Sequence, residues 1–225
     1  MSDAPFQRLI DSTRIKCPGS LDGMIQQELF NLLREFTQRT NVWQEEISFL
    51  PLTNVYDYLI SPTEQGYINR LIWVEGARSA TNPMPLSGPP QQAYLPAYMQ
   101  TGGVLPGAPG TNMALVRIIS APSNNPTWYA HVALTIADPT DAYGIPVIPD
   151  WIVDKYYMPL LDGTLSRMMG MPSKPYSNSA LAAYHAKRYN TGLNLCRNEM
   201  AHGNAVGGQS WRFPSPSGRS RSQKY

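Results

Sequence analysis

The sequence predicts an α+β fold, in which one N-terminal and two C-terminal helices form a helical lobe with an inserted small antiparallel β domain and an extended C-terminal arm. Apolar residues recur every three or four positions over residues 21–40 and again after residue 150, as in amphipathic helices. Between them lie short runs rich in Val, Ile, Tyr and Trp, which are typical of strands. We expect residues 1–41 and 145–202 to form the helical lobe, 42–144 the β domain and 203–225 the arm.

The first expected helix covers residues 21–40. Ser20 precedes it and offers a hydroxyl of the kind that caps helix N-termini. Polar residues occupy the opposite face, so the helix needs one apolar surface to pack on, most simply other helices. Its apolar positions are Leu21, Ile25, Leu29, Leu32, Leu33 and Phe36.

Five strands are expected, at residues 43–50, 54–60, 67–75, 113–119 and 127–137. The first three follow one another through short connections, so we expect them to pair as antiparallel neighbours. Together the five predict a compact sheet or a small sandwich. Large aromatic side chains are usually buried, which favours core positions for Trp43, Trp73, Trp128 and Trp151.

A long loop interrupts the β domain at residues 79–111. It contains seven prolines, five glycines and no charge, so it cannot form a helix or a central strand. Disordered segments are normally charged, whereas this one is apolar, which favours a surface that becomes buried in an assembly. A flap folded over its own domain is the alternative. The residues expected to contact a neighbouring subunit or another protein are Tyr94, Leu95, Tyr98 and Met99.

Two further helices are expected in the C-terminal part. The first covers residues 150–170, with Asp150 as its cap and Pro159 as a kink or break in its middle. The second covers residues 178–202 and carries a narrow apolar stripe, which predicts pairing with the preceding helix or the first one. The stripe consists of Ala182, Ala186, Tyr189, Leu193, Cys196 and Met200.

Catalytic, cofactor and metal sites are not expected. The three histidines, His131, His185 and His202, show no metal-ligand spacing to one another or to paired carboxylates. Cys196 and His202 share a helix but stand six residues apart, so they project from different faces and do not form a dyad. A hydrolase that uses Cys196 or His202 is the enzymatic alternative.

The cysteines and the N-terminus bear on the compartment. Cys17 and Cys196 lie near opposite ends of the chain, which fits a reducing cytoplasm better than a disulfide framework. No run of eighteen apolar residues occurs, and the first residues lack the basic region and apolar run of a signal peptide. We therefore expect a protein that is neither secreted by that route nor membrane-spanning.

The expected arm differs from the rest of the chain in charge. Residues 1–200 hold fourteen Lys and Arg and sixteen Asp and Glu, whereas residues 201–225 hold four basic residues and no acid. Glycines in GNAVGG predict a hinge, and WRFP an anchor that orders on a partner, because aromatic and Arg side chains dominate interfaces. The alternatives are contact with nucleic-acid phosphates and a solvated tail. The expected partner-binding residues are Trp211, Arg212, Phe213, Arg219, Arg221 and Tyr225.

A longer pattern runs through the C-terminal region. Its residues are Pro149, Asp150, Trp151, Gly163, Leu165, Met168, Met171, Pro172, Lys174, Pro175, Tyr176, Leu181, Ala182, Tyr184 and Gly192. In the N-terminal half, Phe36, Arg39, Thr40 and Trp43 fit Phe-x-x-Arg-Thr-x-x-Trp. Together they resemble the head-to-tail adaptor proteins of short-tailed bacteriophages, the tail tubular protein A type included. The chain departs from that pattern in its longer loop at 79–111.

The resemblance implies a structural virion protein without enzymatic activity, cofactor or membrane contact. It implies a homo-oligomeric ring of about twelve copies below the portal protein, assembled in the host cytoplasm. The C-terminal arm would bind the portal, the β domain would face the tail nozzle, and genomic DNA would pass through the lumen. The alternatives are another neck or tail-tube component and, from a different class, a basic-armed DNA-binding module.

Overall fold

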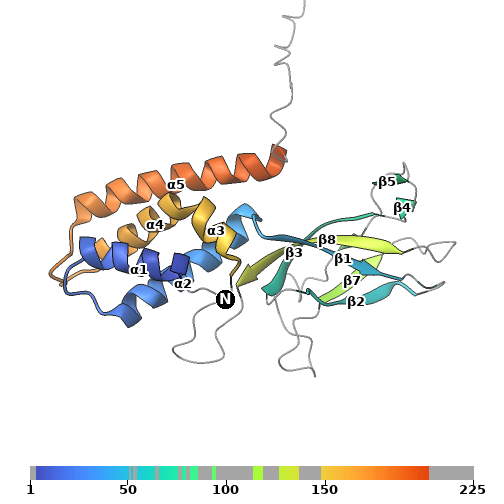
Figure 1. Cartoon of the computed structure of the whole chain (residues 1–225), viewed down its shortest axis with the longest axis horizontal. Coiled ribbons are helices and arrows are strands. Elements are labelled where there is room, and N and C mark those ends of the chain that lie inside the picture. The colour runs from blue at the N-terminus through green and yellow to red at the C-terminus, as the bar shows by residue number, and fades with distance from the viewer. Residues whose placement is uncertain are drawn as a thin grey trace, which may run out of the picture.

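The computed structural model is an α+β chain and describes residues 4–50, 52, 55–63, 66–75, 78–79, 82–85, 93–94, 114–118, 127–136 and 148–202. The expected arm at 203–225 and most of the 79–111 loop lie outside these residues. Figure 1 shows the helices gathered at one end of the long axis and the strands at the other. The predicted α+β class is confirmed.

Helices from both ends of the chain pack together. Helices α1 and α2 precede the strands and α3 to α5 follow them, and α4 contacts α1, α2 and α5. The described residues form α1 (Ala4–Lys16), α2 (Asp22–Thr40), α3 (Asp150–Lys155), α4 (Tyr157–Met169) and α5 (Ser179–His202).

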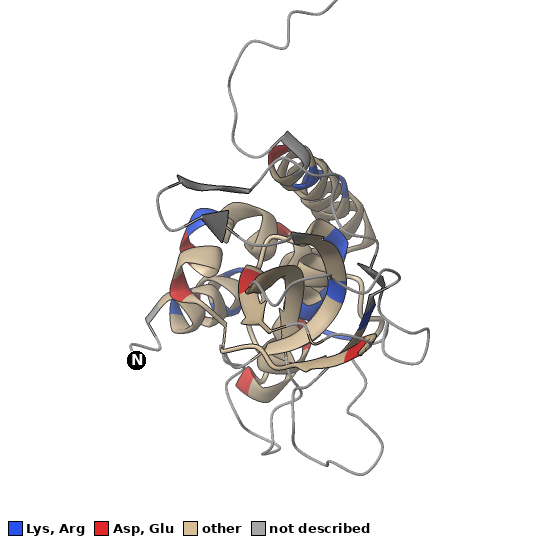
Figure 2. Cartoon of the chain, turned by 90° about the vertical axis from the view of Figure 1, so that its right-hand side faces the viewer, with Lys and Arg blue, Asp and Glu red and all other residues tan. Residues whose placement is uncertain are grey.

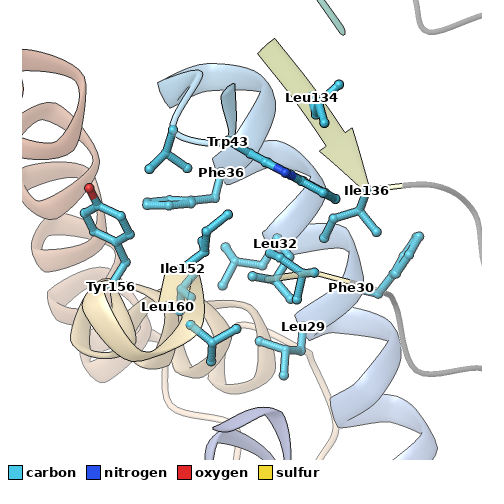
Figure 3. Close-up of a cluster of buried hydrophobic side chains, with 14 of the residues drawn as sticks. Leu29, Phe30, Leu32, Phe36, Trp43, Leu134, Ile136, Ile152, Tyr156 and Leu160 are labelled. Atoms are coloured by element: carbon cyan, nitrogen blue, oxygen red, sulfur yellow. The ribbon is translucent and has the colours of Figure 1, made fainter. Parts of the chain in front are cut away.

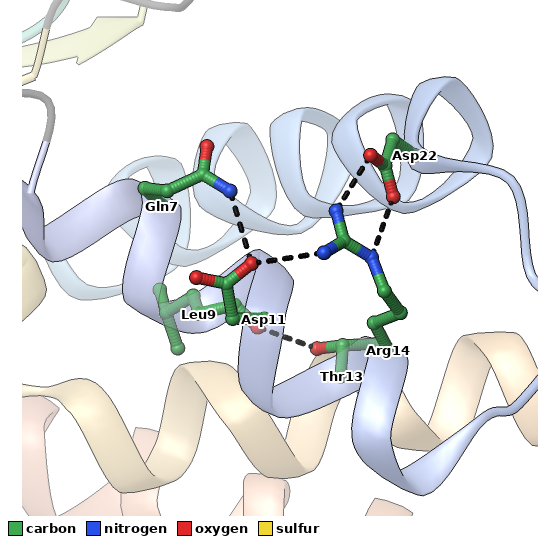
Figure 4. Close-up of polar contacts among 6 residues, drawn as sticks. All are labelled: Gln7, Leu9, Asp11, Thr13, Arg14 and Asp22. Carbon is green, nitrogen blue, oxygen red and sulfur yellow. Dashed lines mark hydrogen bonds and ion pairs between the residues drawn. The ribbon is translucent and has the colours of Figure 1, made fainter.

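Helix α1 was not predicted. Phe6, Leu9, Ile10 and Thr13 are nevertheless spaced by three, one and three residues, and all four are buried against the other helices. Arg14 fixes α1 to the start of α2, because its Nε and Nη2 atoms donate to the two carboxylate oxygens of Asp22 at 2.9 and 2.6 Å (Figure 4). The N-terminal segment thus adds a helix to the lobe.

Two of the predicted helix caps are wrong. Leu21, not Ser20, occupies the N-cap of α2, and the Ser20 hydroxyl instead donates to the Cys17 carbonyl. Pro149 occupies the N-cap of α3, so Asp150 lies inside its first turn, where a carboxylate favours the helix dipole. The predicted break between residues 150 and 170 is confirmed, but it falls at Tyr156, and Pro159 lies in the first turn of α4, where its missing N–H removes no helical hydrogen bond.

The strands form small antiparallel sheets. Their orders are β1–β8–β3, β2–β7–β6 and β4–β5. Phe49 of β1 packs its ring on Tyr58 of β2 at 5.2 Å, which joins the first two sheets. The described strands are β1 (Gln44–Phe49), β2 (Asp57–Ile60), β3 (Gly66–Glu75), β4 (Arg78–Ser79), β5 (Asn82–Pro85), β6 (Ala93–Tyr94), β7 (Ala114–Ile118) and β8 (Trp128–Ile136).

The expected pairing of the first three strands as neighbours is wrong. Strands β1 and β3 both pair with β8, and β2 pairs with β7. The last five residues of β8 are all buried, so this strand gains most from having a neighbour on each side. The burial of β8 therefore decides which strands pair, and the short connections between β1, β2 and β3 do not.

One hydrophobic core runs from the helices into the β1–β8–β3 sheet. Figure 3 shows Phe36 of α2 and Trp43 beside Leu134 and Ile136 of β8, and all four are buried. A buried hydrogen bond of 2.9 Å joins the hydroxyls of Thr37 and Thr135 across the same contact. The helices and the sheet thus share one core within the described residues.

Two of the four tryptophans expected in the core are exposed. Trp43 and Trp128 are buried, but Trp73 and Trp151 each leave about half of their surface in solvent (50% and 48%). Trp151 lies on the exposed face of α3, whereas its neighbours Ile152 and Val153 are buried. The expectation is therefore wrong for Trp73 and Trp151.

Candidate interaction surfaces

Helix α5 lies unusually close to α4. An added Cβ on Gly192 would lie 2.6 Å from Cγ of Pro159, and one on Gly163 would lie 2.7 Å from Leu32 and 2.9 Å from Tyr189. Glycine is therefore required at both positions for the helices to approach this closely. The predicted stripe on α5 is confirmed as its packing face, since its central members Tyr189, Leu193 and Cys196 are buried.

A groove runs along the outer side of this helix pair. It has a volume of about 450 Å³, and its walls include Met158 and Pro159 of α4 and Tyr184 and Leu195 of α5. The exposed surface of the groove is mainly apolar, although Asp162, Lys187, Arg188 and Thr191 also line it, so the groove suits an apolar side chain of another protein.

A buried carboxylate organises the groove. Asp162 of α4 has a side chain only 7% exposed, and it lies 2.8 Å from Nδ1 of His185 and 3.0 Å from Nε of Arg188. Arg188 also donates to the Tyr184 hydroxyl at 3.2 Å. The cluster fixes the orientation of three side chains on α5, two of which line the groove.

The outer face of α5 carries exposed apolar residues. We call Leu181, Tyr184 and Leu195, together with Met158 of α4, the outer stripe. Each is at least 44% exposed, and Leu195 reaches 64%. Apolar side chains gathered on one face, rather than scattered singly, mark contact surfaces on soluble proteins.

Exposed apolar residues also lie at the junction of the first two helices. Ile15 at the end of α1 is 81% exposed, and Leu21 before α2 is 69% exposed. Figure 1 shows α5 along one side of the helices and α1 along the other, with α4 between them. The lobe therefore has exposed apolar residues on α4 and α5 and, separately, at the junction of α1 and α2.

A separate, polar cleft lies where the helices meet the strands. It has a volume of about 890 Å³ and is formed by the end of α2, the start of β1, β3 and the last turns of α5. Figure 2 views the chain from the strand end and colours Lys and Arg blue. The lining residues are Gln38, Arg39, Thr40, Asn41, Gln44, Arg70, Ile72, Asn194, Arg197, Asn198 and Met200.

Most of the sequence-predicted contact residues fall on parts of the chain that the structure leaves undescribed. Tyr94 lies in β6, where it pairs with Arg117 of β7 at the edge of a sheet. The remaining predicted contact residues lie outside the described residues; they are Leu95, Tyr98, Met99, Trp211, Arg212, Phe213, Arg219, Arg221 and Tyr225. The outer stripe was missed, although the spacing of Leu181, Tyr184 and Leu195 along one helix would have shown a second apolar face.

Cys196, the nucleophile of the enzymatic alternative, is a core residue. It is 2% exposed, and burial raises the pKa of its thiol. Cys17 is fully buried, and burial raises the pKa of its thiol as well. Neither thiol is free to attack a substrate from the surface, because the thiolate is the reactive form and both are held as buried thiols.

Both thiols are therefore expected to resist modification in the folded chain. At pH 8 a disulfide reagent such as DTNB should react at least about 100-fold more slowly than with the urea-unfolded chain, since reaction must await opening of the core. The unfolded chain, in which both thiols titrate, serves as the control. Rapid reaction of Cys196 in the folded chain would restore the hydrolase alternative.

Among the described residues, no group of His, Cys, Asp and Glu has the geometry to hold a metal ion. No described helix combines the length and apolar character that crossing a membrane requires. A scan against protein-family models and a search of curated proteins found no match to this chain.

Proposed function

We propose that this chain is a structural subunit of a bacteriophage neck, a head-to-tail adaptor that assembles into a ring between portal and tail nozzle. In this proposal the ring holds about twelve copies, and DNA passes through its lumen. The arm at 203–225 binds the portal, and the β domain faces the nozzle. The finer division into a helical lobe, an inserted β domain and an extended arm belongs to the same proposal.

The observation that carries the proposal is the presence of exposed apolar residues on two different sets of helices, α4 with α5 and α1 with α2. A ring is built from heterologous contacts, in which one surface of a subunit meets a different surface of the next. The outer stripe on α4 and α5 and the exposed Ile15 and Leu21 at the junction of α1 and α2 are candidates for two such different surfaces. A two-fold dimer would need only one patch that matches itself.

The resemblance to adaptor proteins supports the same function. Gly163 and Gly192, two residues of that pattern, stand where α4 meets its neighbours most closely. Leu181 and Tyr184 belong to the pattern as well, yet both are exposed. Side chains that contribute little to the core of their own chain are candidates for contact with another.

Native mass determination tests the ring. The wild-type chain should form a ring alone or when mixed with the portal, and replacing Leu181, Tyr184 and Leu195 by Ser should leave a folded monomer. The matched control replaces Leu50, Tyr56 and Leu59 by Ser, which removes an equally exposed set of two leucines and a tyrosine from the strand end. A monomeric wild type that ignores the portal would contradict the proposal.

Deletion of residues 203–225 tests the arm separately. The truncated chain should keep its helical circular dichroism and its melting temperature but lose attachment to the portal. Undiminished attachment would remove the arm from the proposal without affecting the ring. Ring formation without any portal attachment would favour another neck or tail-tube component.

A further inference from the structure

The polar cleft concentrates positive charge without acid. Three arginines from three elements line it, Arg39 of α2, Arg70 of β3 and Arg197 of α5, and no Asp or Glu is among the described lining residues. Arg39 pairs with Glu35 at 2.6 Å, outside the lining. Within the described part of the chain, Arg70 and Arg197 have no ion pair, so their charges remain available to a ligand.

A β-bulge at Asn69 turns Arg70 toward the cleft, and a second bulge at Ile72 restores the alternation of the strand. Strand β3 shifts its register on β8 at Asn69 and again at Ile72. Strict alternation would place Arg70 on the face of Ile68 and Val74, which are buried, yet Arg70 is exposed and Leu71 packs on the core. A bulge re-aims the side chains that follow it, and such bulges are often found beside functional sites.

Five amide side chains accompany the arginines. Arg, Asn and Gln are among the residue types that donate hydrogen bonds to the phosphates and sugars of nucleic acids. Interfaces with nucleic acids are also more polar and more positive than those between proteins, and this cleft, unlike the outer stripe, is mainly polar. The amides are Gln38, Asn41, Gln44, Asn194 and Asn198.

We infer that this cleft binds the phosphate backbone of a nucleic acid, with Arg70 and Arg197 contacting phosphates. The inference extends the proposed function, in which DNA passes the subunit, but the cleft lies within one chain and its binding does not require a ring. It also differs from the basic-armed DNA-binding module, because the charges are on α5 and β3 and not in the arm.

A competing explanation comes from the helix dipole. Arg39 lies in the last turn of α2 and Arg197 near the end of α5, where cations stabilise exposed carbonyls. In that case the arginines contribute to stability and not to binding. The two explanations differ for Arg70, which lies on a strand, and they are separated by measuring stability beside affinity.

The test uses the full-length chain with Arg212, Arg219, Arg221 and Lys224 replaced by Gln, so that the arm does not mask the cleft. Fluorescence anisotropy with a short labelled DNA duplex gives the affinity over a range of salt concentrations. Adding R70Q and R197Q should weaken binding about tenfold at low salt and lower the slope of log K against log salt by about 2. Thermal unfolding of each variant measures stability.

The matched control instead adds K16Q and K174Q, which removes two exposed charges outside the cleft. It should leave affinity and slope nearly unchanged. Equal losses in both variants, no binding by the starting chain, or a loss of melting temperature alone would each overturn the inference. So would equal competition by polyglutamate at matched charge, because phosphate would then not be recognised. The ring is tested by native mass and the cleft by anisotropy, so failure of the cleft inference can be told apart from failure of the ring proposal.

Discussion

Replacing Gly192 with alanine is expected to lower the free energy of unfolding by about 2 kcal/mol, because the new Cβ overpacks the contact between α5 and α4 at a cost of about 3 kcal/mol and regains about 1 kcal/mol of helix propensity. The Cβ would lie 2.6 and 2.9 Å from Cγ and Cβ of Pro159. A proline ring cannot rotate aside as a long side chain does, so the helices must separate. The gain in helix propensity from Gly to Ala, about 1 kcal/mol, offsets only part of this cost.

Urea unfolding followed by circular dichroism measures the effect. Gly23→Ala is the matched control, since Gly23 is also helical but has nothing within 4 Å of an added Cβ. This control should be neutral or slightly stabilising, by up to about 1 kcal/mol. If G192A were as stable as G23A, the two helices would not be held at the distance that the structure gives.

Helical periodicity explains which parts of the helical lobe could be predicted. The α5 packing face follows from the spacing of Tyr189, Leu193 and Cys196, because helical periodicity is a local property of the sequence. Helix α1 has a similar local signal in Phe6, Leu9 and Ile10, which was overlooked. Both helices were therefore accessible to sequence reasoning.

Strand pairing was less accessible, because it depends on contacts far apart in sequence. The paired residues of β1 and β8 are 79 to 89 positions apart in the sequence, and no local pattern encodes that choice. The bulges at Asn69 and Ile72 reverse the faces that strict alternation gives Arg70 and Leu71. A cleft that depends on such bulges cannot be found from alternation alone.

The residues of the candidate surfaces also differ in how far the sequence could predict them. Leu181 and Tyr184 were noted only as part of a family-like pattern, and their exposure appears once the packing face of α5 is fixed by its neighbours. Asp162 carried no signal at all, since a single acid in an apolar helix has no periodicity. Its partners His185 and Arg188 lie on another helix, more than twenty residues away.

Asp162 is the buried charge on which the outer groove depends. Its carboxylate accepts from His185 and Arg188 and is almost fully removed from solvent. Arg188 is 44% exposed at its side chain, so water can solvate it when the carboxylate is lost, whereas the His185 side chain is only 12% exposed. Loss of Asp162 therefore leaves a polar imidazole buried without its partner, which is costly.

Asp162→Ala is expected to lower the free energy of unfolding by about 3 kcal/mol, the lower end of the range for breaking a buried ion pair, because Arg188 is partly solvated. Asp162→Asn keeps an acceptor oxygen and should lose only about 1 kcal/mol. Asp11→Ala is the control, since Asp11 pairs with Arg14 at the surface and should cost at most about 1 kcal/mol. Urea unfolding ranks the three variants, and equal losses for D162A and D11A would show that the cluster contributes no more than a surface pair.

Because the cluster orients Tyr184 and Arg188, D162A should also weaken ring formation under conditions in which the variant remains folded, which links the stability of the groove to the proposed assembly.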